Sequence, residues 1–185
     1  MDEKRLPRLR LYGAVLALLA EMAHLCWEHF HGGVLRHHIL NRADLPAISN
    51  WWGLLLLPAL TWHLIGRINK RSAALADGKS SALPNSVLAG FAGSLLFGVL
   101  LSSCFSFGYA TLVDYVFEGL LLLALLLPVY RAECVLGFVL GMTFVFGVVL
   151  PAAIASIIAA VSMLIHRLVY PTLVRLWVGL ARQPE

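Results

Sequence analysis

The sequence predicts an all-α fold, in which residues 1–185 form a single polytopic bundle of membrane-spanning helices. The first observation is composition: 60% of the residues are hydrophobic and only 13% are charged, whereas soluble proteins carry about 25% charged residues. The second is a series of apolar runs close to the length of about 20 residues that a membrane-spanning helix needs. The third is a strong bias of basic residues toward alternate linkers. Together they argue against a soluble domain, a disordered chain and a nucleic-acid-binding protein.

Six apolar runs predict transmembrane helices at 11–30, 51–68, 86–108, 110–130, 134–150 and 152–169. The linkers 31–50 and 69–85 are polar and contain the turn-forming residues Gly, Pro, Asn and Asp. The stretch 134–169 is too long for one upright helix and short for two. Because Pro151 lies near its middle, we expect a tight hairpin there. One helix in place of this hairpin would give five spans.

The basic residues predict the orientation of the helices. With the N-terminus in the cytoplasm, 12 of the 14 Lys and Arg residues fall in inner segments, and only Arg36 and Arg42 fall outside. Such a bias is typical of cytoplasmic loops. Five spans would move Arg167, Arg175 and Arg182 to the outside, so that the 14 basic residues would divide as 9 and 5. We therefore predict six spans, both termini in the cytoplasm, and a bacterial-type inner membrane as the location.

Two segments are expected to lie outside the bilayer. The segment 31–50 is predicted to be a polar extracytoplasmic loop. Beyond Pro171, Arg175 and Arg182 stand seven residues apart on one face of an apolar segment. This pattern predicts a short interfacial helix and tail over 171–185 on the cytoplasmic surface.

Small residues predict where the helices pack closely. Without a strong hydrophobic drive between helices in lipid, close packing needs small side chains at regular spacing. They recur every four positions in the third, fifth and sixth spans: Gly90, Ser94, Gly98, Ser102 and Ser106; Gly137 and Gly141; Ala152, Ser156 and Ala160. Since Ser102 and Ser106 lie toward the outer end of their span, we also expect them to line a cavity.

Ionisable residues form one row on each of two predicted spans. The row on the first span consists of Glu21, His24, Glu28 and His31, which cover an arc of about 80°. The row on the fourth span consists of Thr111, Asp114, Tyr115 and Glu118. An ionisable group within a span costs at least about 2.5 kcal/mol on insertion scales, so Glu21, Asp114 and Glu118 are candidate functional and catalytic groups. Glu133 adjoins Arg131 at the inner boundary and is expected to be solvated.

The polarity of the chain is concentrated in the outer half of the predicted bundle. The loop above both rows adds further polar residues: His37, His38, Asn41, Asp44 and Asn50. We therefore expect the two rows to face each other and to line a hydrated pocket that opens to the non-cytoplasmic side.

The leading functional hypothesis is a small carrier or channel for a small solute or cation. Its expected binding residues are Glu21, His24, Glu28, Asp114, Tyr115, Glu118, Ser102 and Ser106. Because a buried carboxyl group takes up a proton more readily than a solvated one, we expect proton coupling. The expected partners are the lipid bilayer, the transported molecule or ion and further copies of the chain.

Two other functions fit the same residues. The first is a membrane-embedded, metal-dependent enzyme that acts on a lipid-borne or periplasmic substrate. Imidazole and carboxylate ligands suit a divalent transition metal such as zinc, and the candidate ligands are His24, Glu28, His31, His37 and His38. The second is an accessory subunit whose polar row pairs with a partner helix. The sequence leaves open whether the protein is an enzyme.

Overall fold

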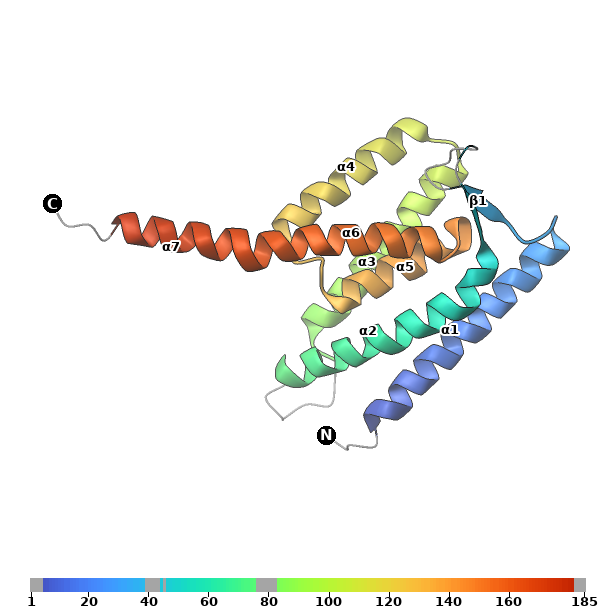
Figure 1. Cartoon of the computed structure of the whole chain (residues 1–185), viewed down its shortest axis with the longest axis horizontal. Helices are drawn as coiled ribbons and strands as arrows, with labels where there is room; N and C mark the ends of the chain where they lie inside the picture. The colour runs from blue at the N-terminus through green and yellow to red at the C-terminus, as the bar shows by residue number, and fades with distance from the viewer. Residues whose placement is uncertain (1–4, 39–43, 45, 76–82, 182–185) are drawn as a thin grey trace.

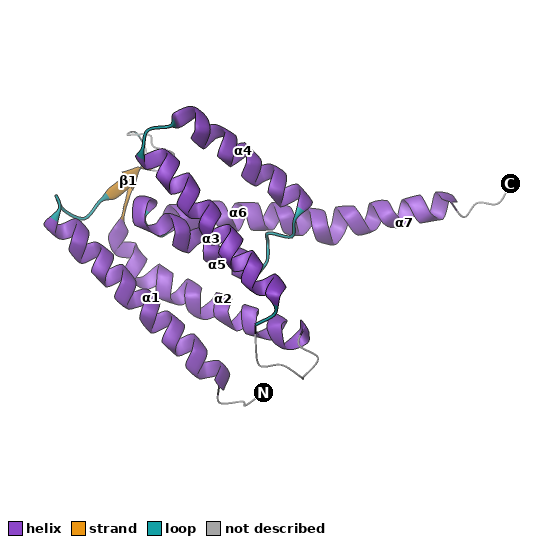
Figure 2. Cartoon of the chain, turned by 180° about the vertical axis from the view of Figure 1, so that it is seen from behind, coloured by secondary structure: helices purple, strands orange, loops and turns teal. Residues whose placement is uncertain are grey.

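The computed structural model describes residues 5–38, 44, 46–75 and 83–181, and helices dominate it (Figures 1 and 2). The expected all-helical class is confirmed, with one short two-stranded ribbon added. The described elements, in chain order, are α1 (Arg5–Phe30), β1 (Arg36–His38), β2 (Ala47–Ser49), the 3₁₀ turn η2 (Asn50–Trp52), α2 (Gly53–Leu75), α3 (Asn85–Ser106), α4 (Ala110–Leu126), α5 (Ala132–Phe146), α6 (Val149–Leu164), the π turn η3 (Ile165–Val169) and α7 (Tyr170–Ala181).

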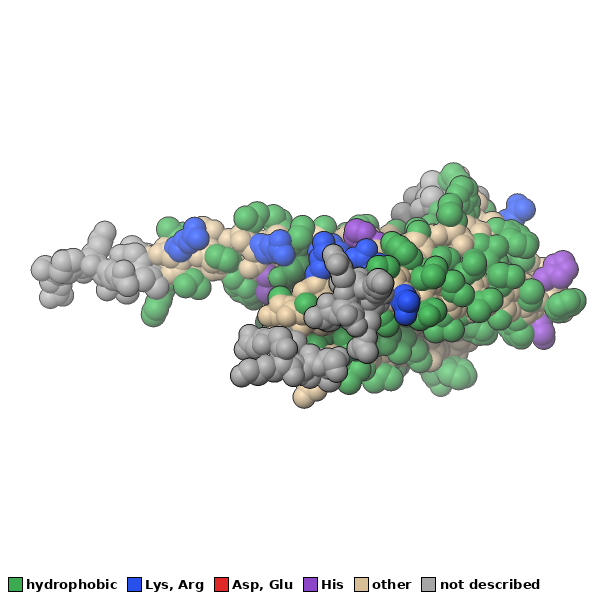
Figure 3. All heavy atoms as spheres, turned by 90° about the horizontal axis from the view of Figure 1, so that it is seen from below, with side chains coloured by type: hydrophobic (Ala, Val, Ile, Leu, Met, Phe, Trp, Pro, Cys, Tyr) green, Lys and Arg blue, Asp and Glu red, His purple; other side chains and the backbone are tan. Residues whose placement is uncertain are grey.

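Three of the described helices are long and apolar enough to cross a membrane: Pro7–Phe30, Asn85–Ser106 and Val149–Trp177. A fourth apolar helix, Ala132–Phe146, is shorter. Large hydrophobic side chains such as Leu16, Leu96 and Leu126 point away from the bundle, and hydrophobic atoms cover most of the bundle face in Figure 3. An apolar exterior of this extent is typical of a surface that contacts lipid.

The stretch 134–169 forms two helices, as expected, but the chain turns earlier than predicted. The turn lies at Gly147, whose φ of 66° is rarely adopted by residues with a side chain. Pro151 lies in the first turn of α6. A proline there costs little, because the N–H that it lacks would have no helical partner. The glycine therefore ends α5, and the proline lies in the first turn of the next helix.

The helix expected beyond Pro171 is present as α7, but it continues from α6, and its interfacial position stays a prediction. The chain passes from α6 through the five-residue π turn η3 into α7 without a break, and the resulting rod projects beyond the bundle (Figure 1). Pro171 cannot donate a backbone hydrogen bond within the helix. The wider π turn directly before it absorbs this interruption. Residues 182–185 lie outside the described part of the chain.

The expected loop 31–50 contains regular structure. Strand β1 pairs antiparallel with β2, with His37 opposite Ile48. The 3₁₀ turn η2 follows β2 directly and leads into α2. The polar composition of the segment obscured this ribbon, whose short strands carry little hydrophobic pattern. Asn41 lies outside the described residues.

The small residues of the third and fifth predicted spans lie at a close helix contact, as expected, and the structure shows that this contact joins α3 to α5. A Cβ atom on Gly98 would lie 2.8 Å from the carbonyl oxygen of Phe138, and one on Gly141 would lie 2.9 Å from the amide nitrogen of Val99. Backbones that approach this closely need glycine at the contact. On α6 only Ala152 of the predicted stripe packs against the core, whereas Ser156 and Ala160 are exposed. The buried face of α6 comprises Pro151, Ala155, Ile158 and Ser162.

The contact between α3 and α5 gives a testable prediction. We expect Gly141→Leu to lower the free energy of unfolding by about 1–3 kcal/mol, because an added side chain would overlap the backbone of α3. Thermal unfolding in detergent measures the loss. Gly119→Leu is the matched control, since a Cβ on Gly119 has no heavy atom within 4 Å. Equal melting temperatures for the two variants would contradict the close contact.

Candidate functional site

A group of polar side chains is buried where α1 ends and α2 begins. Glu21, His24 and Glu28 of α1 are 1%, 8% and 3% exposed, and Asn50 of η2 is 4% exposed. We call these four residues the outer polar cluster, after the membrane side that the charge distribution predicts. Three of the four residues in the row on α1, all except His31, are therefore buried together. Asn50 of η2 completes the group.

Glu28 is the best-anchored member of the outer polar cluster. Its Oε1 accepts a hydrogen bond of 2.6 Å from the Asn50 side-chain amide, and its Oε2 accepts one of 3.2 Å from the Leu35 backbone amide. The Nε2 atom of His24 lies 3.4 Å from Oε1 of Glu28. These contacts tie the ribbon and η2 to the end of α1, which fixes the outer end of the cluster.

Glu21 lies deeper and is much less satisfied. Its carboxyl group contacts Gly53, the first residue of α2, in the space that a Cβ would fill. An anionic group is favoured beside the N-terminal end of a helix, where the peptide dipoles leave positive charge. The Nδ1 atom of His24 is 3.8 Å away, and both Glu21 oxygens are buried without a hydrogen-bond partner. Glu21 is therefore a buried ionisable group whose bonding capacity is unused.

The turn between α5 and α6 closes the cluster from the side of the bundle. Gly147 lies against the side-chain oxygen of Asn50 and leaves no room for a Cβ. The ring of Phe144 lies 5.1 Å from that of His24 and 5.3 Å from that of Trp27. Sequence reasoning missed these wall residues, because a glycine and a phenylalanine in an apolar run give no sign of which polar group they cover.

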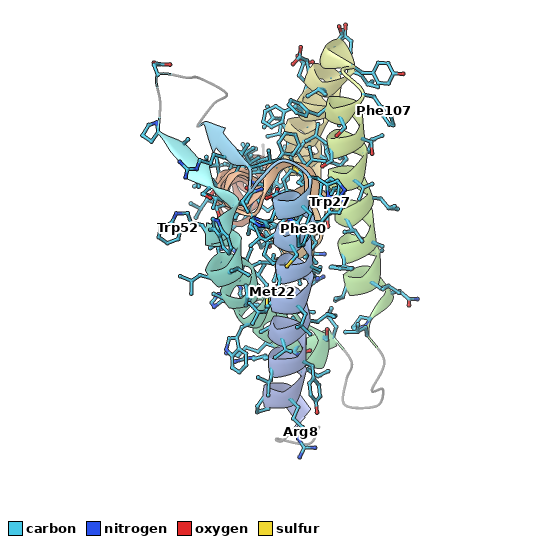
Figure 4. The ribbon with its side chains drawn as sticks, turned by 90° about the vertical axis from the view of Figure 1, so that its right-hand side faces the viewer. Arg8, Met22, Trp27, Phe30, Trp52 and Phe107 are labelled. Carbon is cyan, nitrogen blue, oxygen red and sulfur yellow. The ribbon has the colours of Figure 1, made fainter. Side chains whose placement is uncertain are left out.

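Aromatic and basic residues mark the two ends of α1. Figure 4 shows Trp27 and Phe30 at one end with Trp52 at the same level, and Arg8 at the opposite end. The outer polar cluster therefore lies on the aromatic side of the molecule, close to a level at which Trp is enriched in membrane proteins.

The expected pocket between the first and fourth helices is not formed. Helix α4 packs against α3 and α6, whereas α1 packs along α2, and Figure 1 shows α1 and α4 on opposite sides of the bundle. The row on α4 is exposed along its whole length: Thr111, Asp114, Tyr115 and Glu118. The physical reason is that α4 buries its apolar face, with Leu120 and Ala124, so its polar face points outward.

The proposed metal ligands do not assemble. His31 is exposed, stacks on Trp27 at 4.5 Å between ring centroids, and directs Nδ1 at the Trp27 carbonyl oxygen, 2.7 Å away. Among the residues that the structure describes, no group of three His, Cys, Asp or Glu side chains is arranged to hold a metal ion. His31 is therefore not brought together with His24 and Glu28, and the side chains of the other two predicted ligands, His37 and His38, lie outside the described part.

The two serines expected to line a cavity have different surroundings. Ser102 is buried in the contact between α3 and α5, where its hydroxyl donates to the Gly141 carbonyl oxygen at 3.3 Å. Ser106 ends α3 and is exposed. Ser102 therefore has a packing role that the spacing of small residues already explains.

A second buried charge lies at the other end of the bundle. Glu133, expected to be solvated, is 1% exposed and forms an ion pair with Arg71 of α2. It lies in the first turn of α5, where the helix dipole favours a carboxylate, and a Cβ on Gly90 of α3 would lie 3.1 Å from its Cγ. We call Arg71 and Glu133 the inner ion pair. No local pattern links residues this far apart in sequence, so the pairing could not be predicted.

Comparisons of the chain with protein-family models, curated proteins and solved structures find no match. The interpretation of the outer polar cluster therefore rests on its geometry and on the membrane-protein character of the helices.

Proposed function

We propose that the protein is a small multi-pass membrane carrier or channel that moves protons, or a small cation in exchange with them, through the outer polar cluster. The observation that carries this proposal is the Glu21 carboxyl group, which is 1% exposed and has two oxygens without a hydrogen-bond partner. Burying an ionisable group without a partner is costly, and such groups inside membrane proteins are functional candidates by default.

The three titratable groups form a series along α1. His24 Nδ1 is 3.8 Å from Glu21 and His24 Nε2 is 3.4 Å from Glu28. An imidazole can take up a proton on one nitrogen and release it from the other. At a rise of about 1.5 Å per residue, the series extends about 10 Å along the helix. It therefore supports a relay through the outer third of a hydrocarbon core about 30 Å thick.

Further polar atoms lie along the seam between α1 and α2. Thr61 of α2 is 5% exposed, and its hydroxyl has no hydrogen-bond partner. The Nε atom of Arg10 is also buried and unpartnered, and the guanidinium group lies against Gly66. Unsatisfied polar groups in a membrane protein usually face a polar pathway or one another. We therefore propose that protons or cations cross the inner half of the membrane along this seam.

The orientation and location belong to the same proposal: six spans, both termini in the cytoplasm and a bacterial-type inner membrane. Lys and Arg side chains lie along the rod at η3 and α7 and on the adjoining part of the bundle, as seen in Figure 3. Arg8 lies toward that end of α1, opposite Trp27 and Phe30 (Figure 4). A basic end and an aromatic end support a cytoplasmic and an outer side, respectively.

Ion movement in liposomes tests the proposal directly. The full chain is reconstituted with a pH-sensitive dye inside, and a membrane potential is imposed with a potassium gradient and valinomycin. We expect the internal pH to change faster than in protein-free liposomes. The same liposomes loaded with a sodium indicator test exchange of a small cation. Absence of both proton and sodium movement would overturn the proposal.

A further inference from the structure

A cavity of about 340 Å³ lies among α3, α4, α5 and α6, apart from the outer polar cluster. Most of its walls are aliphatic or aromatic, with residues such as Phe97, Leu123 and Phe138. Apart from Ser94, its polar lining residues come from the segments where α3 and α5 begin: Ser86, Arg131, Glu133 and Cys134. The cavity is therefore apolar along its length and charged at one end.

The space is open to an added group. Gly93 lines the cavity, and a Cβ there would have no heavy atom within 4 Å. The Ser94 hydroxyl, also in the wall, already donates to the Gly90 carbonyl oxygen at 2.8 Å. The long wall therefore offers mainly apolar contacts, because the Ser94 hydroxyl is already hydrogen-bonded within α3.

The charged end carries an excess of positive charge. The carboxylate of Glu133 is paired with Arg71, and no carboxylate in the described part of the chain pairs with Arg131, which is half-buried in the cavity wall. The charges of Arg71 and Arg131 repel each other, and the guanidinium group of Arg167 lies 5.4 Å from the ring centroid of Tyr130. Three cations and one anion leave a net charge of +2 at this end.

We propose that this cavity holds one acyl chain of an anionic phospholipid, whose phosphate binds Arg131. The volume falls at the small end of the range of about 300–1,000 Å³ for ligand pockets, so it suits a single chain while the headgroup stays at the mouth. Arginine is well suited to phosphate, because its planar guanidinium group donates two parallel hydrogen bonds. The site goes beyond the proposed function and does not depend on it, since the cavity shares no residue with the outer polar cluster.

Cysteine alkylation tests the proposal on the unmodified chain. Cys134 lines the cavity, whereas Cys26 is exposed on α1 and reports the general access of the reagent. In one detergent, we expect phosphatidylglycerol to slow alkylation of Cys134 by N-ethylmaleimide about tenfold more than phosphatidylcholine with the same acyl chains. Both lipids carry the phosphate, but phosphatidylcholine adds a cationic choline group, which the net charge of +2 at this end of the cavity repels. The rate at Cys26 should stay unchanged, and equal effects of the two lipids on Cys134 would overturn the proposal.

Two variants divide the site into its apolar and charged parts, with lipid retention measured by native mass spectrometry. Gly93→Phe should fill the cavity and abolish retention of phosphatidylglycerol, whereas Gly119→Phe, on α4 outside the cavity, should not. Arg131→Gln should keep lipid bound but remove the preference for phosphatidylglycerol. Arg131 makes no side-chain cap of α5, so the substitution removes no capping hydrogen bond. Unchanged preference in Arg131→Gln would overturn the assignment of the phosphate site.

Discussion

Glu21→Gln is expected to reduce proton movement to the level of protein-free liposomes. Glutamine keeps the size of glutamate and its contact with Gly53, but its amide cannot take up and release a proton at neutral pH. Since Glu21 is the innermost titratable group of the series along α1, its loss should interrupt every path that uses His24 and Glu28. The measurement is the rate of internal pH change under an imposed membrane potential.

Glu118→Gln is the matched control for this prediction, because it makes the same substitution on an exposed carboxyl group of α4. It should leave the flux unchanged. Melting temperature separates loss of function from loss of fold: Glu21→Gln should melt no lower than the wild type, since it replaces a buried carboxyl group that makes no hydrogen bond by a neutral amide. Normal flux in a folded Glu21→Gln protein would exclude the path along α1, and loss of flux in Glu118→Gln would move the path to α4.

Arg71→Gln is expected to have the largest effect on stability. Removing the arginine leaves the Glu133 carboxylate 1% exposed and without its cation. Breaking a buried pair in this way typically costs 3–5 kcal/mol. Because the Arg71 side chain is itself 25% exposed, we expect about 3 kcal/mol, measured as the change in the free energy of unfolding in detergent.

The double variant Arg71→Gln/Glu133→Gln tests whether the loss comes from the pair. Two neutral amides remove the uncompensated charge, so most of the stability should return. Lys70→Gln controls for the loss of a cation on an exposed neighbouring residue and should change the stability by less than about 0.5 kcal/mol. A double variant as unstable as Arg71→Gln alone would show that Arg71 stabilises the fold without acting through Glu133.

Local pattern predicted the elements that depend on residues close together in sequence. The spacing of Glu21, His24 and Glu28 placed them on one face of α1, and the structure buries all three. The small residues on α3 and α5 likewise indicated a close helix contact, because only glycine permits backbones to approach so far. The division of 134–169 into two helices was predicted as well, although Gly147 and not Pro151 makes the turn.

Pairing between helices could not be read from the same patterns. Helical phase shows which residues share a face but does not show which neighbour that face meets. The row on α4 illustrates this limit: Asp114 and Glu118 share a face, yet α4 buries Leu120 and Ala124 on another face and leaves the row exposed. The ion pair of Arg71 and Glu133 is the converse case, because two charges at predicted boundaries meet only after α2 and α5 pack.

The sequence by itself determined the helical class, the membrane character of the chain and the polar face of α1, since each follows from composition or from periodicity within one segment. Only the tertiary structure decided that this face is covered by Asn50, Gly53 and Phe144 and that α4 stands apart from it. It also decided that Glu133 is buried and that an apolar cavity ends at Arg131. The reason is that these features depend on contacts between distant segments. Helices with similar apolar side chains can pack in many arrangements, so the sequence of each helix does not identify its neighbours.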